Sequence, residues 1–311
     1  MSTEAARNEL RWCLLGPVLW PESTLPELVL PHTIAAWVER ADLTDWPVLP
    51  RRLGLRFETI WAWALDRLPG WKVLASEVQV AGSKGTLGAL DLLADSPDGV
   101  LHIELATKFY LCRRHRDGAS PAHFVGPNRR DRLDKKLQRM HTHQLPMGAR
   151  PETRLALKKR GIPAPTRSVA VLRGVCFSDW RQPNTAGPGR WCTRSELPHA
   201  LPEARVLDRT HWLGGHGALA VLREDALLEA VDAQLVRGAV QLLDAGGRRW
   251  MVVDDDWTQP HDTAPRDDHL AAGVGPSRSW SSRRSHPTGR LQGCGPPPPA
   301  PQAPPPEGGG H

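Results

Sequence analysis

The sequence lacks several features that would have assigned it to a familiar class. No uninterrupted apolar run approaches the length of a membrane span, so the sequence excludes an integral membrane protein. The apolar stretch from Trp12 to Trp20 is broken by Pro17 and has no basic segment before it, unlike a secretory signal. No cysteines form a CxxC pair, so we expect no disulfide framework, no cysteine zinc site and a cytoplasmic location. The five cysteines are Cys13, Cys112, Cys176, Cys192 and Cys294.

Common catalytic signatures are also missing. No GxxxxGK[ST] segment is present, so we do not expect ATP hydrolysis at a phosphate-binding loop. The histidines have no zinc-site spacing, and no Ser/His/Asp or Cys/His nucleophile pattern is recognisable. With 40% hydrophobic and 24% charged residues, the composition is that of an ordinary globular protein. The net charge of +6 permits a polyanionic partner without requiring one.

The chain of 311 residues is long enough for two domains or one elaborated domain. The last segment holds 11 Pro and 8 Gly, so it buries too little apolar surface to order itself. We expect this tail to be solvated and disordered; weak partner binding through polyproline II is the alternative. The expected parts are an N-terminal helical extension at 1–50, a core at 51–178, a C-terminal α/β extension packing on the core at 179–260, and the tail at 261–311.

The core begins with one helix and three strands. Apolar residues recur at three- and four-residue steps from position 53 to 68, which predicts an amphipathic helix that Pro69-Gly70 ends. Alternating or apolar runs then predict strands at 71–81, about 86–94 and 100–110.

A second core helix follows a polar loop. Asn128 is expected to cap its N-terminus, and Pro146 is expected to close it. Its apolar stripe consists of Leu133, Leu137 and Met140. The other predicted elements are helices at 152–160 and 224–243 and strands at 167–177 and 248–253.

Two carboxylates in apolar strands carry the chemical argument. Asp91 and Glu104 have apolar neighbours, and burying such charges unpaired is costly. Two adjacent carboxylates also repel each other, whereas a hard divalent cation, Mg²⁺ or Mn²⁺, would relieve both penalties. Both acids lie on one face if paired residue numbers sum to an odd value. A sum of 193, which the loop length permits but does not force, would place Asp91 opposite His102 and diagonal to Glu104.

Lys108 lies on the same strand face as Glu104, two side-chain repeats further along. A lysine close to the metal site can orient the attacking water and stabilise charge that develops on a phosphate. The alternative is an edge-strand lysine that faces solvent beside two surface carboxylates.

Three further residues are candidates for the same site. Glu58 and Glu77 are possible additional ligands; the alternatives are a solvated helix flank for Glu58 and an exposed strand face for Glu77. Gln144 follows the apolar stripe by four residues, so it should face inward. It could hold a catalytic carboxylate or lysine in place, or it could be a satisfied buried amide.

The second helix is strongly basic. Arg132, Lys136, Arg139 and His143 form one ridge at steps of four, three and four. Such a ridge can contact a phosphate backbone, although a solvated charged face is the usual alternative. The expected nucleic-acid contacts are Arg129, Arg132, Lys136 and Arg139.

The order helix, three strands, helix, strand, with Asp91, Glu104 and nearby Lys108, resembles the core of the PD-(D/E)XK nuclease superfamily. More specifically, the chain resembles a bacterial family labelled domain of unknown function 1853 from about residue 8 to 258. The resemblance implies a restriction-endonuclease-like α/β fold, a mixed sheet flanked by helices. The segments that carry it are LGLRFE at 53–58, GALD at 88–91, ELATKFYL at 104–111, GPN at 126–128, DRL at 131–133, KL at 136–137, HQL at 143–145 and MVVDDDW at 251–257.

The sequence departs from the superfamily pattern at two positions. Ala106 stands where the motif has its lysine, two residues after Glu104, and Leu90 stands where proline is common. Lys108 is one strand repeat further on, roughly 7 Å away.

These observations predict a metal-dependent nuclease that hydrolyses DNA phosphodiesters, with DNA favoured over RNA. Asp91, Glu104 and the Leu105 carbonyl would bind Mg²⁺ or Mn²⁺, Glu58 or Glu77 would complete the metal site, and Lys108 would position water. Because Ala106 replaces the motif lysine, the alternative is a catalytically inactive nucleic-acid-binding protein. A third alternative is an interaction scaffold that works through the Pro-rich tail.

Overall fold

In the computed structural model of the chain, the described residues are 2–83, 85–114, 120–182 and 188–259. They belong to one compact unit, Met1–Thr263. The tail predicted at 261–311 lies outside the described residues. No helix in the described part of the chain is long and apolar enough to cross a membrane.

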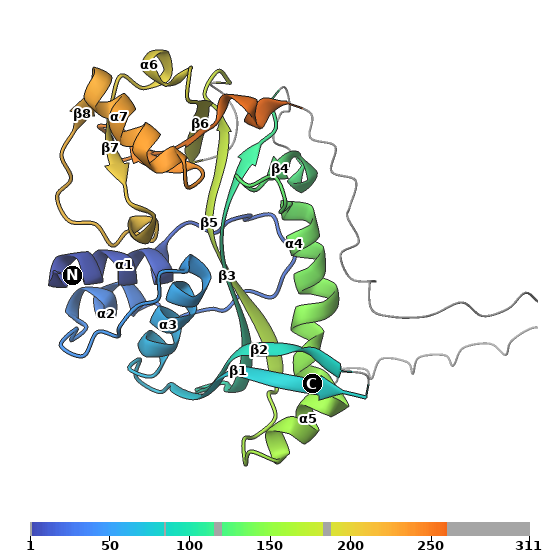
Figure 1. The fold of residues 1–311 in the computed structure, drawn as a ribbon. Coiled ribbons are helices and arrows are strands. Elements are labelled where there is room, and N and C mark those ends of the chain that lie inside the picture. The colour runs from blue at the N-terminus through green and yellow to red at the C-terminus, as the bar shows by residue number, and fades with distance from the viewer. Residues whose placement is uncertain (1, 84, 115–119, 183–187, 260–311) are drawn as a thin grey trace, which may run out of the picture. The chain divides into compact units, whose positions relative to one another are not determined.

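The described residues form a mixed α/β fold around one large sheet (Figure 1). Its first three strands pair antiparallel, as consecutive strands with short turns do. The strands are β1 Lys72–Gly82, β2 Gly85–Ser96, β3 Gly99–Cys112, β4 Phe124–Val125, β5 Arg167–Asp179, β6 Gly189–Thr193, β7 Glu203–Leu207, β8 Leu222–Arg223, β9 Val240–Leu243 and β10 Arg249–Val253. The order in the sheet is β1-β2-β3-β5-β6-β10-β9-β7-β8, with β4 paired to β3. The contacts β3–β5, β5–β6 and β6–β10 are parallel, so the sheet is mixed.

Helices flank both faces of this sheet. The α-helices are α1 Thr3–Leu15, α2 Ile34–Arg40, α3 Leu53–Leu65, α4 Leu133–Arg139, α5 Pro151–Lys158, α6 Leu197–Ala200 and α7 Glu224–Leu235. The short helical turns are η1 Pro121–His123, η2 Met140–Gln144, η3 Leu145–Ala149, η4 Arg209–His211 and η5 Asp255–Thr258.

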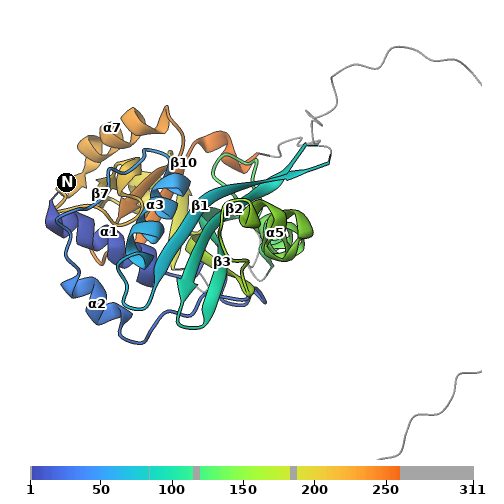
Figure 2. The ribbon, with the colours of Figure 1, turned by 90° about the horizontal axis from the view of Figure 1, so that it is seen from below.

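The two faces of β3 have different partners, and this difference positions the candidate site. Ile103 and Leu105 belong to the core that includes buried residues of α1, α2 and α3. Ala106 and Tyr110 pack instead with Leu133 of α4 and its neighbours. Successive strand residues point to opposite faces, so the even-numbered side chains of β3 face α4. Figure 1 shows α3 and α4 on opposite sides of β3, and Figure 2 shows α3 and α5 on opposite sides of the strands β1 to β3.

The N-terminal segment continues along one edge of β5. Leu19 N–H donates to Leu172 O at 3.1 Å, and Leu28 N–H donates to Ala170 O at 3.0 Å. β5 pairs with β6 only near its end, over 177–179, so the earlier part of this edge is free to accept the segment. Residues 18–28 thereby satisfy backbone groups that would otherwise be unpaired.

The predicted start and end of the second core helix were wrong. The helix α4 begins at Leu133 with Arg132 as N-cap, whereas Asn128 accepts a hydrogen bond from Arg130 N–H in a preceding turn. The reason is tertiary: β4 pairs with β3, and Val125 bridges to Arg132, so the chain before Leu133 is not helical. The helical path also passes Pro146, through the π-helical turn η2 and the 3₁₀ turn η3. Proline is tolerated there because the first residues of a helical turn need no N–H donor.

The helix predicted over 224–243 was too long. It ends at Leu235, and Val240–Leu243 forms strand β9 between β10 and β7. A short apolar run does not distinguish a buried strand from a helix, and pairing with β10 decides it here. The elements predicted at 53–68, 71–81, 100–110, 152–160, 167–177 and 248–253 are present with small shifts of their ends.

Candidate active site

The candidate site lies where β2 and β3 separate. The ladder between them runs from Ser96–Gly99 to Leu92–Ile103, so paired numbers sum to 195. The register therefore differs from the sum of 193 that the loop length also permitted: extending the ladder by one pair places Asp91 opposite Glu104 instead of His102. The cause is the two-residue turn, in which Ser96 pairs directly with Gly99 and its hydroxyl donates to Gly99 O at 2.7 Å. The odd parity was correct, so both acids still share a face.

Asp91 and Glu104 lie close together in the structure. The Leu105 N–H donates to Asp91 Oδ2 at 2.9 Å, so the carboxylate binds the β3 backbone just beyond the last ladder pair. Burial, together with the charge of Glu104, raises the pKa of Asp91 from 3.8 to about 7, although the Leu105 hydrogen bond opposes the shift. Burial and the charge of Glu104 therefore disfavour ionisation of Asp91.

Glu104 is completely buried, and both of its carboxylate oxygens are bonded. His102 Nε2 lies 2.9 Å from Oε1, and Gln144 Nε2 donates to Oε2 at 2.5 Å. The other ring nitrogen of His102 lies 2.9 Å from Ser168 Oγ, which fixes the ring. The sequence reasoning placed His102 on this face but gave it no role; its spacing of two residues from Glu104 was the available signal.

Lys136 enters the same site from α4. Its Nζ donates to Gln144 Oε1 at 3.0 Å, so Gln144 binds both Lys136 and Glu104. Burial and the nearby charge of Lys108 lower the pKa of Lys136, against the opposing effect of Glu104 and Asp91. The sequence reasoning assigned Lys136 to an outer ridge of phosphate contacts. A signal for the inward position was present, because Lys136 lies three residues after Leu133 and four before Met140, both fully buried.

Lys108 lies at the rim of the site. Its Nζ donates to Asp131 Oδ2 at 2.7 Å, and 39% of its side chain is exposed. Its charge still acts on Lys136, so both amines belong to one electrostatic neighbourhood. Of the two lysines, Lys136 is the one bonded to a residue, Gln144, that also binds Glu104.

Glu58 approaches the site from α3. Burial raises the pKa of Glu58, and the charges of Glu77 and Glu104 raise it further. Glu58 therefore lies within the field of the carboxylate pair instead of on a solvated helix flank.

Glu77 is exposed on β1, between the ladder pairs Ser76–Leu92 and Val78–Leu90, which places it opposite Asp91. Its φ of 50° is in the left-handed region, which is costly for a residue with a side chain. The unfavourable backbone conformation therefore occurs at Glu77, the acid that was predicted as a possible additional metal ligand.

The four residues predicted to contact nucleic acid lie in different environments. Arg129 donates to Asp256 at 2.6 Å, and Arg132 binds Asp134 through two hydrogen bonds of 3.0 and 2.6 Å. Arg139 is exposed in the last turn of α4. Lys136 is directed into the site, so the four residues do not form one outward row.

Asp91 and Glu104 are the residues of this site that could hold a divalent cation. Among the described residues, no group of three or more His, Cys, Asp or Glu side chains is arranged to hold a metal ion. Asp91 and Glu104 supply two carboxylates, and burial together with the charge of Glu104 raises the pKa of Asp91. Mg²⁺ is commonly held by one or two carboxylates together with substrate phosphates, so this pair fits such an ion.

The fold and site define a mixed α/β protein with a large sheet flanked by helices, in which buried Glu104 and half-buried Asp91 lie near a lysine and a glutamine. The chain belongs to the family described as domain of unknown function (DUF1853), whose profile matches residues 8–245. Every candidate site residue lies within that match. Comparison with curated proteins and with solved structures finds no match.

Proposed function

We propose that this protein is a metal-dependent nuclease that hydrolyses DNA phosphodiester bonds on a restriction-endonuclease-like, PD-(D/E)XK core. The observation that carries the proposal is the convergence of Asp91 and Glu104, together with the buried amine of Lys136. In chain order α3, β1, β2 and β3 are followed by β4, α4, α5 and β5, and the helix, three strands, helix and strand within this series support the proposal. Paired acids beside an amine are suited to phosphoryl transfer, in which negative charge must be stabilised as it develops.

In this proposal Asp91 and Glu104, with the Leu105 carbonyl, would hold Mg²⁺ or Mn²⁺. When bound, the cation supplies positive charge to the phosphate oxygens in the transition state. It also removes the repulsion between the two acids, which favours the ionised form of Asp91. Glu58 and Glu77 add negative charge nearby that strengthens cation binding.

Lys136 takes the role that the sequence pattern assigned to a lysine on β3. Ala106, the residue at that motif position, packs with Leu133 and Met140. A small side chain there lets α4 approach the strand closely enough to bring Lys136 to the acids. The lowered pKa of Lys136 favours proton exchange with the attacking water, and the amine also stabilises phosphate charge.

Gln144 is a positioning residue in this scheme. Its amide orients Glu104 on one side and Lys136 on the other. A fixed geometry of this kind reduces the reorganisation that the site needs during the reaction. Arg139 and the partly exposed Arg132 are the proposed contacts to DNA phosphates.

The alternative function is nucleic-acid binding without catalysis. It is favoured by Ala106 at the motif lysine position and by the ion pair that Lys108 makes with Asp131. This alternative predicts salt-sensitive DNA binding but no cleavage and no stabilisation by Mg²⁺.

The test is Mg²⁺-dependent cleavage of plasmid, single-stranded and branched DNA by the full chain. Asp91→Asn and Glu104→Gln should abolish cleavage, as should removal of the metal with EDTA. Asp98→Asn is the matched control, because Asp98 is an exposed acid on the β2–β3 turn. Equal residual cleavage by the wild type and both site variants would contradict the proposal, and binding without cleavage would establish the alternative.

A further inference from the structure

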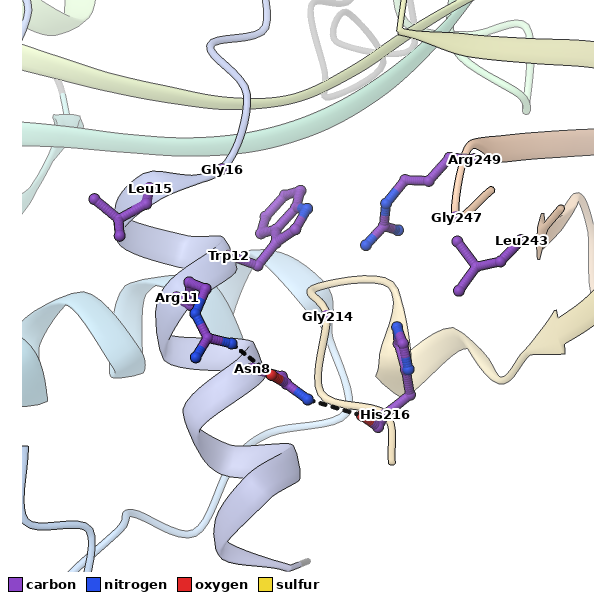
Figure 3. A pocket seen from close by; sticks show the side chains of 10 residues that line it. All are labelled: Asn8, Arg11, Trp12, Leu15, Gly16, Gly214, His216, Leu243, Gly247 and Arg249. Atoms are coloured by element: carbon purple, nitrogen blue, oxygen red, sulfur yellow. Dashed lines mark hydrogen bonds between the residues drawn. The ribbon is translucent and has the colours of Figure 1, made fainter. Parts of the chain in front are cut away.

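A pocket separate from the candidate active site lies between α1, the Gly214–His216 segment and the β9–β10 hairpin (Figure 3). Its volume is about 440 Å³, and none of the ten described residues that line it is acidic. Two of them, Arg11 and Arg249, are cationic. The lining shares no residue with the candidate active site.

Arg249 is the unusual group in this pocket. Its Nη1 donates to two neutral acceptors, Trp212 O at 2.8 Å and Gln241 Oε1 at 2.7 Å. Its guanidinium lies 5.6 Å from the centre of the Trp12 ring. Burial lowers the pKa of Arg249 to about 10, and within the described chain no carboxylate pairs with it. A buried cation without a counter-charge is unfavourable, so an anion from outside would stabilise it.

Trp12 supplies a second donor. Its indole Nε1 is buried and, among the described residues, has no hydrogen-bond partner. Figure 3 shows the indole ring and the Arg249 guanidinium facing the same space. Arg11 differs from Arg249, because it is already paired with Glu39 at 2.7 Å. Arg249 and the Trp12 N–H are therefore two donors that the pocket offers to a ligand.

We propose that this pocket binds a small organic anion, a carboxylate or a phosphate monoester that carries a planar apolar group. The Arg249 guanidinium binds the oxyanion, and the Trp12 N–H donates a further hydrogen bond. The Trp12 ring and Leu243 contact the apolar part of the ligand. The volume lies in the range of sites that enclose a small molecule.

Two charged probes and their uncharged counterparts test the proposal on the full chain. The pairs are benzoate with benzamide and AMP with adenosine, followed by thermal shift and isothermal titration calorimetry. At least one anion should raise the melting temperature saturably while its uncharged counterpart does not. Whether benzoate or AMP binds distinguishes a carboxylate from a phosphate monoester as the ligand.

Substitutions then locate the binding. Arg249→Gln should weaken it by about tenfold or more, since a hydrogen bond to a charged group is lost. Gly247 has a φ of 79° and open space around its Cβ position, so both Asn and Asp fit there. Gly247→Asp adds a carboxylate to the lining and should weaken anion binding, whereas the matched Gly247→Asn should not.

The proposal is overturned if neither benzoate nor AMP binds at millimolar concentration. It is equally overturned if binding is unchanged in Gly247→Asp. The Gly247 pair keeps the test decisive even if Arg249→Gln fails to fold. DNA cleavage is measured in parallel, and its loss or retention has no bearing on this pocket.

Discussion

Lys136 Nζ donates to Gln144 Oε1 at 3.0 Å, although the two residues are eight positions apart on a helical segment. Gln144 closes the π-helical turn η2, where the widened backbone departs from regular α-helix. The same side chain donates to Glu104 on β3. A helix and a strand are thus joined at the candidate site by one amide. Four predictions follow from this arrangement and the packing around it.

The first concerns the two lysines. We expect Lys136→Met to lower Mg²⁺-dependent DNA cleavage by roughly a hundredfold or more, since it removes the amine held beside the acids. The matched change Lys108→Met should have a smaller effect, because Lys108 pairs with Asp131 at the rim. Single-turnover cleavage rates give the comparison. A larger loss of cleavage rate in Lys108→Met than in Lys136→Met would instead assign the catalytic role to Lys108.

The second concerns pH and Asp91, whose pKa is about 7 in the folded protein against an ordinary value of 3.8. The stability linked to its protonation is fully present below about pH 4 and is lost as pH rises through about 7. Asp91→Asn should therefore be more stable than the wild type at about pH 8, by roughly 2–4 kcal/mol, with little difference at about pH 4.

Urea unfolding at both pH values measures this effect. Asp98→Asn is the control and should change stability by less than about 0.5 kcal/mol, because Asp98 lies on an exposed turn. Mg²⁺ should stabilise the wild type at high pH but not Asp91→Asn. If Asp91→Asn lost stability with rising pH as steeply as the wild type does, burial and the charge of Glu104 would not be raising the pKa of Asp91.

The third concerns Gln144. Gln144→Ala removes a donor to buried Glu104 and an acceptor of Lys136, and should cost roughly 1–3 kcal/mol of folding stability. Gln144→Glu keeps the shape but places a second carboxylate against Glu104. Its penalty should grow between about pH 5 and about pH 8, since like charges repel once both are ionised. A pH-independent penalty for Gln144→Glu would contradict the contact with Glu104.

The fourth concerns the close approach of β5 to β3. A Cβ on Gly174, whose φ is 153°, would lie 1.8 Å from Lys108 O, a backbone atom that cannot move aside. Gly174→Ala should therefore cost roughly 3 kcal/mol or more. Gly161→Ala is the matched control: its φ of 66° is also unfavourable, but nothing lies within 4 Å, so about 1–2 kcal/mol is expected. Equal thermal shifts in the two variants would refute this close contact.

Much of the candidate site could be predicted from local patterns. The alternation along β3 places Glu104 and Lys108 on one face, and the apolar stripe of α4 implies that Gln144 faces inward. The role of His102 was missed, although its spacing of two residues from Glu104 on one strand was a local signal of their contact. The start of α4 was also missed, because it depends on pairing between β4 and β3.

The sequence by itself determined the core strands β1, β2, β3 and β5 and the amphipathic helix α3, because these follow from periodicities of two and 3.6 residues that each segment carries alone. It left the shared face of Asp91 and Glu104 conditional on the register of β2 against β3. Only the tertiary structure decided the register that aligns Asp91 with Glu104, since it depends on the tight turn at Ser96–Gly99. It likewise decided that Lys136, more than Lys108, is held with the acids. The position of Lys136 depends on how closely α4 packs over Ala106 of β3. This contact joins two segments, and the sequence pattern of neither segment encodes it.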